Sequence, residues 1–176
     1  MGGRVEKLPY YTYADYEHWE DQWELIGGQR VEQPSPIYGH QLIETRLIVA
    51  FFNALRNFPR YTVLPQFDYL VREDTVLQPD MLVVADGRDG KYLNFPPTLV
   101  AEILSPSTAS RDKKVKFDIY ESQGILYYLI LSPETKMVEI YHWENGKYVL
   151  KTTGKDILFT FDLGDCKVNI DFSEVW

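Results

Sequence analysis

Two acidic side chains stand inside apolar segments, where a carboxylate is hardest to accommodate. Asp80 belongs to QPDMLVV (78–84) and Glu102 to TLVAEIL (98–104), and both segments have the composition of short buried strands. A buried carboxylate loses its hydration and must be paired, protonated or bound to a cation. Carboxylate oxygens suit Mg²⁺, with Mn²⁺ as a substitute, better than softer metals. We interpret the pair as ligands of a Mg²⁺ ion that assists phosphodiester cleavage.

The numbering predicts that these two acids face each other. If residues 79–84 and 98–104 form neighbouring antiparallel strands, their connection is centred near residue 91, midway between Asp80 and Glu102. Directly opposed residues have Cβ atoms roughly 4.5–5.5 Å apart, so both carboxylates can reach one cation at about 2.1 Å from each oxygen. A slip of one residue would separate them onto different faces. The alternating neighbours are assigned to the core on the other face: Met81, Val83, Leu99, Ala101 and Ile103.

A basic helix is predicted after the second of these strands. The hydroxyl-rich SPSTAS (105–110) can cap a helix at about 110–122. Its four cations are Arg111, Lys113, Lys114 and Lys116. One interpretation of them is a solvated helix face. The alternative is that they serve the cation site, and it rests on the apolar strand ILYYLIL (125–131) that follows the helix. A strand–helix–strand crossover makes the two strands parallel. The start of the helix then lies near Glu102, with Lys116 close to the cation.

A longer helix is predicted at residues 40–58, ending before Pro59, from apolar residues at helical spacing. His40 and Glu44 border its apolar face. In one interpretation His40 begins the helix and Glu44 pairs with Arg46 or a tyrosine. In the other, Glu44 approaches the two carboxylates as a further ligand of the metal or of its water.

The remaining segments predict short elements joined by turns, and no repeat or linker divides them. Composition, with 45% hydrophobic residues in a chain of 176, fits one core and a single α/β (α+β) domain over residues 1–176. The expected elements are a short helix within 10–27, a Gly27-Gly28 turn and a small strand, an edge strand at 61–71 containing Pro65, a hairpin around Asn145-Gly146, and short strands at 156–176.

Composition and charge also narrow the range of possible functions. A net charge of −8 and a pI near 4.9 disfavour broad, nonspecific affinity for nucleic acid but allow a local basic groove. The apolar segments are too short to cross a membrane and no secretory segment is evident, so we expect a cytoplasmic protein. The single Cys166 cannot form an intramolecular disulfide, and no base is evident that would activate its thiol.

Several segments that together cover most of the chain resemble a known pattern. They are WELIGGQRVEQPSPIYGHQ, QPDMLVV, VAEILSPST, RDKKVKFDIYESQGILYYLIL and the terminal FSEVW. They resemble the PD-(D/E)XK nuclease superfamily, and more closely a large bacterial family of restriction-endonuclease-like proteins of unassigned function. The resemblance implies a restriction-endonuclease-like mixed β-sheet flanked by helices, and the chain adds a C-terminal β-hairpin.

The resemblance also implies roles for individual residues. Asp80 and Glu102 would hold Mg²⁺, and Leu104 stands where the superfamily places a strand lysine. In the family that this sequence resembles, the lysine lies on the following helix, where Lys116 matches it and Lys113 and Lys114 are alternatives. That lysine would orient the attacking water or stabilise the transition state. The other helix cations, Arg111 with Lys113 and Lys114, would contact backbone phosphates.

The function predicted from these features is metal-dependent hydrolysis of DNA, with a homodimer expected from the way similar nucleases cut two strands. Two alternatives stay open. A catalytically inactive nucleic-acid-binding or assembly protein could use the same fold, and the acidic pI favours that interpretation. A nuclease acting on RNA would use the same metal chemistry.

Overall fold

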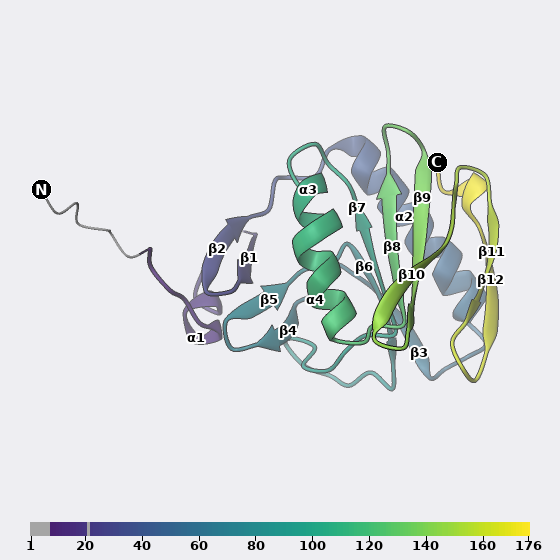
Figure 1. The fold of residues 1–176 in the computed structure, drawn as a ribbon. Helices are drawn as coiled ribbons and strands as arrows, with labels where there is room; N and C mark the ends of the chain where they lie inside the picture. The colour runs from purple at the N-terminus through teal and green to yellow at the C-terminus, as the bar shows by residue number, and fades with distance from the viewer. Residues whose placement is uncertain (1–7, 21) are drawn as a thin grey trace, which may run out of the picture.

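A six-stranded mixed sheet forms the centre of the computed structural model, which describes residues 8–20 and 22–176 (Figure 1). The parallel pair is β7 and β8, and the other neighbours are antiparallel. The predicted mixed sheet is therefore confirmed. In spatial order its strands are β10 (Lys147–Gly154), β9 (Met137–Glu144), β8 (Tyr127–Ser132), β7 (Leu99–Ile103), β6 (Met81–Ala85) and β3 (Tyr61–Pro65).

Helices cover both faces of this sheet (Figure 1). One face packs against α2 (Tyr38–Leu55) and the C-terminal hairpin of β11 (Leu158–Asp162) and β12 (Lys167–Asp171), which the 3-10 turn η2 (Phe172–Glu174) follows. The other face lies under a helical segment made of α3 (Ala109–Arg111), η1 (Asp112–Lys116) and α4 (Phe117–Ser122). This segment is the basic helix predicted at about 110–122. Its middle turn, η1, is π-helical, a feature that is frequent at functional sites.

The register between β6 and β7 confirms the prediction from the numbering. Met81 pairs with Ala101 and Val83 with Leu99, and the same register places Asp80 opposite Glu102. All of the residues assigned to the core from their alternation are buried on the α2 side. The opposite face is buried as well, because Leu82, Val84 and Val100 pack beneath the tyrosines of the helical segment and β8.

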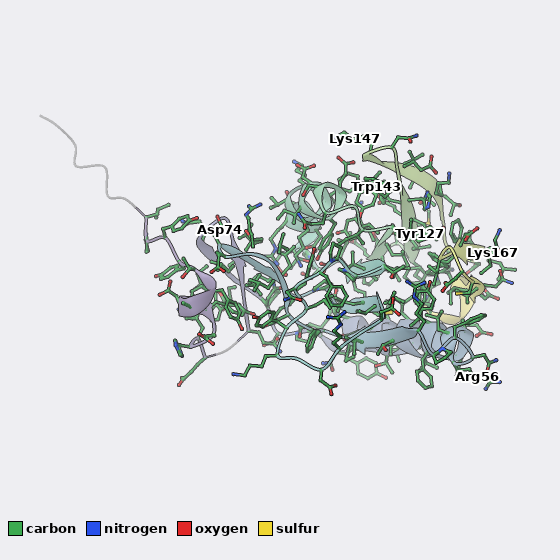
Figure 2. The ribbon with its side chains drawn as sticks, turned by 90° about the horizontal axis from the view of Figure 1, so that it is seen from below. Arg56, Asp74, Tyr127, Trp143, Lys147 and Lys167 are labelled. Carbon is green, nitrogen blue, oxygen red and sulfur yellow. The ribbon has the colours of Figure 1, made fainter. Side chains whose placement is uncertain are left out.

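A second, four-stranded antiparallel sheet lies beside the first. Its strands, in spatial order, are β2 (Gln29–Glu32), β1 (Trp23–Ile26), β5 (Thr75–Leu77) and β4 (Tyr69–Arg72), and the short helix α1 (Tyr13–Tyr16) packs on it. In Figure 2, Asp74 in the turn between β4 and β5 and Lys167 of β12 lie at opposite ends of the molecule. The small sheet is therefore remote from the C-terminal hairpin.

One expectation about local structure is wrong and another is incomplete. The single edge strand expected at 61–71 is two strands, since β3 pairs with β6 whereas β4 pairs with β5 in the other sheet. Pro65 ends the first strand, and residues 66–68 carry the chain across to the second sheet. The short helix expected within 10–27 is present as α1, but the same region also contains an unexpected strand, Trp23–Ile26, which pairs with β2 and β5.

The predicted turns and crossover are confirmed. Gly27 and Gly28 join β1 to β2 with φ of 56° and 76°. Asn145 and Gly146, with φ of 51° and 90°, join β9 to β10, as the type I′ preference of Asn-Gly predicts. The helical segment connects the parallel strands β7 and β8. Within the described part of the chain, no helix is both long enough and apolar enough to cross a membrane.

Candidate active site

A buried lysine holds together a group of acidic side chains beneath the basic helix. The Lys116 ammonium lies 2.7 Å from Glu24 Oε1, 2.9 Å from Glu102 Oε1 and 3.6 Å from Asp112 Oδ1. Burial alone would lower the pKa of Lys116, but the charges of Glu102, Glu24 and Asp112 outweigh it and raise that pKa. The ammonium therefore stays charged although its residue is 1% exposed.

Glu102 stands between this lysine and a tyrosine. Its Oε1 accepts hydrogen bonds from Lys116 Nζ at 2.9 Å and from the Tyr120 hydroxyl at 2.7 Å. Burial raises the pKa of Glu102, Lys116 opposes the rise, and Asp112, Asp80 and Glu24 add to it. The raised pKa thus reflects first the loss of hydration on burial and then the nearby acidic side chains. A further cation nearby would stabilise its ionised form.

Asp80 is held by the neighbouring strand and by helix α2. Its Oδ2 accepts a 2.6 Å hydrogen bond from the backbone N–H of Ile103 and lies 3.3 Å from His40 Nε2. The Ile103 contact fixes the carboxylate beside Glu102, the preceding residue on β7. Asp80 and Glu102 thus approach each other from adjacent strands, as the sequence predicts.

The first turns of α2 bring His40 and Glu44 to the same region. His40 Nδ1 lies 3.8 Å from Glu44 Oε2. Burial would lower the pKa of His40, but Asp80 first and Glu44 next raise it above its usual value. Burial and the charge of Asp80 raise the pKa of Glu44, while His40 opposes them. Arg46 instead donates to the Trp176 carbonyl, so its contact is not with Glu44.

These side chains line one cavity of about 780 Å³, a size within the roughly 300–1,000 Å³ typical of ligand sites. Its walls include both opposed carboxylates and several hydroxyl groups. Its charged and ionisable lining residues include His40, Glu44, Asp80, Glu102, Asp112 and Lys116, and its hydroxyl groups belong to Ser105, Ser107 and Thr108. The cavity therefore opens the acidic group to a substrate.

The two opposed carboxylates each keep one oxygen for a ligand. From the described residues, hydrogen bonds reach Asp80 Oδ2 and Glu102 Oε1, whereas none reaches Asp80 Oδ1 or Glu102 Oε2. Deeper in the cluster, Glu24 Oε2 and Asp112 Oδ1 are buried and accept no hydrogen bond from that same part of the chain. Asp80, Glu102 and Glu24 are thus each held by one oxygen and accept no hydrogen bond from the described residues at the other.

These donors fit a Mg²⁺ ion whose remaining ligands are water and substrate. Among the described residues, no three His, Cys, Asp or Glu side chains converge as a metal cage. Mg²⁺ is usually bound by one or two carboxylates together with waters and substrate phosphates. Asp80 and Glu102 supply such a pair, and the excess of buried negative charge around Lys116 favours a divalent cation.

The predicted phosphate-binding cations are arranged unequally. Arg111 turns toward the acidic cluster, with its Nε 3.8 Å from Glu24 Oε2 and its Nη2 3.3 Å from Gln33 Oε1. Lys113 forms a 2.6 Å ion pair with Glu139 on β9. Lys114 is exposed, and no acidic partner for it occurs among the residues described. Of the three lysines considered for the buried position, only Lys116 occupies it.

Four residues of the cluster were not identified from the sequence as members of the site: Glu24, Asp112, Tyr120 and His40. Glu24 carries the clearest signal, since it interrupts the apolar run WELI in the way that Glu102 interrupts VAEIL. The Glu24 Oε1 that contacts Lys116 also accepts a 2.8 Å hydrogen bond from the Gln78 backbone N–H, which ties the small sheet to the entry of β6. Asp112 lies one helical turn before Lys116 and shares its buried face.

Comparisons with known proteins identify the family and the fold. A family model described as "Uma2: Putative restriction endonuclease" matches residues 10–161. A protein of Synechocystis sp., described as "Uncharacterized protein", is 30% identical over 143 residues, which cover 77% of this chain and 75% of the relative. A crystal structure of "a putative nuclease belonging to DUF820" from Anabaena variabilis superimposes with a TM-score of 0.77 at 14% identity, covering 93% of this chain and 96% of that one. At that identity the structural match shows the fold.

Proposed function

The chain belongs to the Uma2 family, whose model carries the description "Putative restriction endonuclease", and on this premise we propose that it is a Mg²⁺-dependent endonuclease that hydrolyses DNA. The observation that carries the proposal is the opposed pair Asp80 and Glu102. Each has one oxygen held by the protein and the other available at the wall of a cavity. Two carboxylates beside a buried lysine are suited to bind a cation and a phosphate group together.

When bound, Mg²⁺ would lower the pKa of a water molecule and neutralise charge on the phosphoryl oxygens. The residues of the chain hold the geometry for that chemistry. The Ile103 N–H and His40 fix Asp80, and Lys116 and Tyr120 fix Glu102. Lys116 also contributes its positive charge at the cavity wall, which stabilises the negative charge that develops on a phosphate in the transition state.

Glu44 has a separate place in this proposal. It lies on α2 beside His40, at the wall of the same cavity. Because burial and Asp80 raise the pKa of Glu44, its carboxyl group is a better proton acceptor than an exposed glutamate when ionised. We assign it to orienting the attacking water. For substrate binding, Lys114 is the exposed cation of the helix available to a backbone phosphate.

The direct test is cleavage of nucleic acid by the purified chain. We expect it to cut DNA in the presence of Mg²⁺ or Mn²⁺ and to lose this activity when EDTA removes the cation. Plasmid DNA, single-stranded DNA and structured RNA should be compared in parallel, because the same carboxylates can serve either polymer. Cleavage that continues in EDTA would contradict a metal-dependent mechanism, and cleavage of RNA alone would contradict the assignment to DNA.

A further inference from the structure

A second cavity, which the proposed cleavage does not use, lies at the small sheet. Its volume is about 290 Å³, just below the roughly 300–1,000 Å³ range of ligand sites. The cavity is therefore large enough for one small planar group but too small for a large ligand. Four of its lining side chains are aromatic, Tyr13, Tyr16, Trp19 and Trp23, and the others are Glu17, Asp68, Gln78 and Lys91.

The aromatic side chains form a continuous and ordered wall. The ring centroids of Tyr16 and Trp19 are 5.4 Å apart, and those of Trp19 and Trp23 are 6.5 Å apart. The Arg30 guanidinium lies 3.7 Å from the Trp23 centroid and 4.8 Å from that of Trp19, which holds both indoles in place. Aromatic side chains that line a cavity provide a stacking surface for an unpaired nucleobase.

The polar side of the cavity is dominated by one fixed carboxylate. The Tyr16 hydroxyl donates to Asp68 Oδ1 at 3.0 Å, and Gln78 Nε2 donates to the same oxygen at 2.7 Å. No donor from the described residues reaches Asp68 Oδ2. A carboxylate with one oxygen fixed and the other available accepts hydrogen bonds from a ligand at a defined position. Glu17 is a second, exposed acceptor, and Lys91 is an exposed donor.

We propose that this cavity binds one unpaired guanine base of the nucleic acid substrate. This inference rests on the proposed nuclease function. Guanine presents two neighbouring donors, N1–H and the N2 amino group, beside the acceptor O6. The acidic side chains fit the two donors and Lys91 fits O6. Adenine and cytosine each offer a single amino donor next to a ring acceptor. Uracil and thymine place acceptors on both sides of one N–H. Any of these four bases would therefore leave a carboxylate of the cavity facing an acceptor.

The cavity borders the candidate active site. The Gln66 side chain, which lines the cavity of the two carboxylates, donates at 3.4 Å to Gln78, which lines the aromatic cavity. On β1, Trp23 faces the aromatic cavity whereas the next residue, Glu24, faces Lys116, as alternation along a strand requires. A base held here would lie close to the phosphate being cut, so the cavity would select guanine near the cleaved bond.

The test separates base binding from catalysis by working in EDTA. The wild-type chain is titrated calorimetrically with GMP, AMP, CMP and UMP, which carry the same phosphate and differ in the base. We expect GMP to bind about tenfold more tightly than each of the others, since a well-formed pair of hydrogen bonds gives roughly 1–3 kcal/mol of discrimination. Equal affinities, or no binding of GMP, would overturn the proposal and leave the cleavage mechanism untouched.

Two variants locate the binding and a third controls for charge. Asp68→Asn keeps an oxygen for Tyr16 and Gln78 but replaces the available acceptor by a donor, so the preference for GMP should fall about tenfold. Lys91→Met alters an exposed side chain and should weaken GMP binding without changing the affinity for CMP. Asp156→Asn changes an exposed acid shortly before β11, a strand that lies at the opposite end of the molecule from the small sheet (Figure 1), and should have no effect. A preference for GMP that survives both cavity variants would overturn the assignment.

A last comparison distinguishes a nucleic acid from a free nucleotide as the source of the guanine. A single-stranded oligonucleotide containing one guanine should displace bound GMP at lower concentration than free GMP does, because its neighbouring phosphates add contacts. The same oligonucleotide with adenine in place of guanine should displace it less well. Displacement by free GMP at the lower concentration would contradict a site for the nucleic acid substrate.

Discussion

Asp80→Asn and Glu102→Gln are each expected to slow metal-dependent phosphodiester cleavage by about a hundredfold to a thousandfold, the effect of losing several kcal/mol of stabilisation of transition-state charge. Both changes keep the shape of the side chain. An amide oxygen can still accept from the Ile103 N–H at position 80 or from Lys116 at position 102. What each variant loses is the negative charge of the available oxygen.

The control for these variants is Asp118→Asn, a change at an exposed acid of α4. The Asp118→Asn variant should cleave DNA at the rate of the wild type. Initial rates at saturating Mg²⁺ should be measured together with near-ultraviolet circular dichroism, so that a loss of activity is compared between chains of the same fold. Wild-type cleavage rates in both Asp80→Asn and Glu102→Gln would contradict the assignment of these acids as metal ligands.

The second large effect concerns stability. Lys116→Met should lower the free energy of unfolding by about 3–5 kcal/mol, because removing one partner of a buried ion pair leaves uncompensated buried charge. Three acidic side chains lose their shared cation, namely Glu24, Glu102 and Asp112. Methionine retains the length and apolar stem of lysine, so the change removes charge with little change of volume. Urea denaturation at neutral pH measures the difference.

Two further variants show whether charge is the cause. Lys114→Met, an exposed position of the same π-helical turn, should change stability by less than about 0.5 kcal/mol. Adding Glu24→Gln to Lys116→Met should recover part of the loss, since it removes one of the unpaired charges. A Lys116→Met chain as stable as the wild type would mean that the ion cluster does not hold the helix on the sheet.

The sequence was sufficient to predict the two opposed acids and their lysine. Alternation along β6 and β7 separates core residues from Asp80 and Glu102, and a connection centred between them sets the antiparallel register. The parallel crossover then brings the basic helix back over β7, so that Lys116 reaches Glu102. Each step depends on residues close in sequence or on a general rule of chain topology.

The contributions from the small sheet were not predictable in the same way. Glu24 reaches Lys116 only because β1 belongs to a separate sheet that docks beside the helix. The residues around Glu24 predict a short helix within 10–27 but no strand at Trp23–Ile26. The division of 61–71 between two sheets has the same origin, since pairing partners far along the chain decide it. Tertiary contacts overrode local preference at both places.

The most direct test of the central claim is calorimetric titration of Mn²⁺ into the wild type, Asp80→Asn and Glu102→Gln, each with and without a single-stranded oligonucleotide that can supply a phosphate ligand. We expect the wild type to bind Mn²⁺, more tightly when the oligonucleotide is present, and both variants to lose that binding. Unchanged binding in the variants, or no binding by the wild type under either condition, would contradict a metal site formed by Asp80 and Glu102.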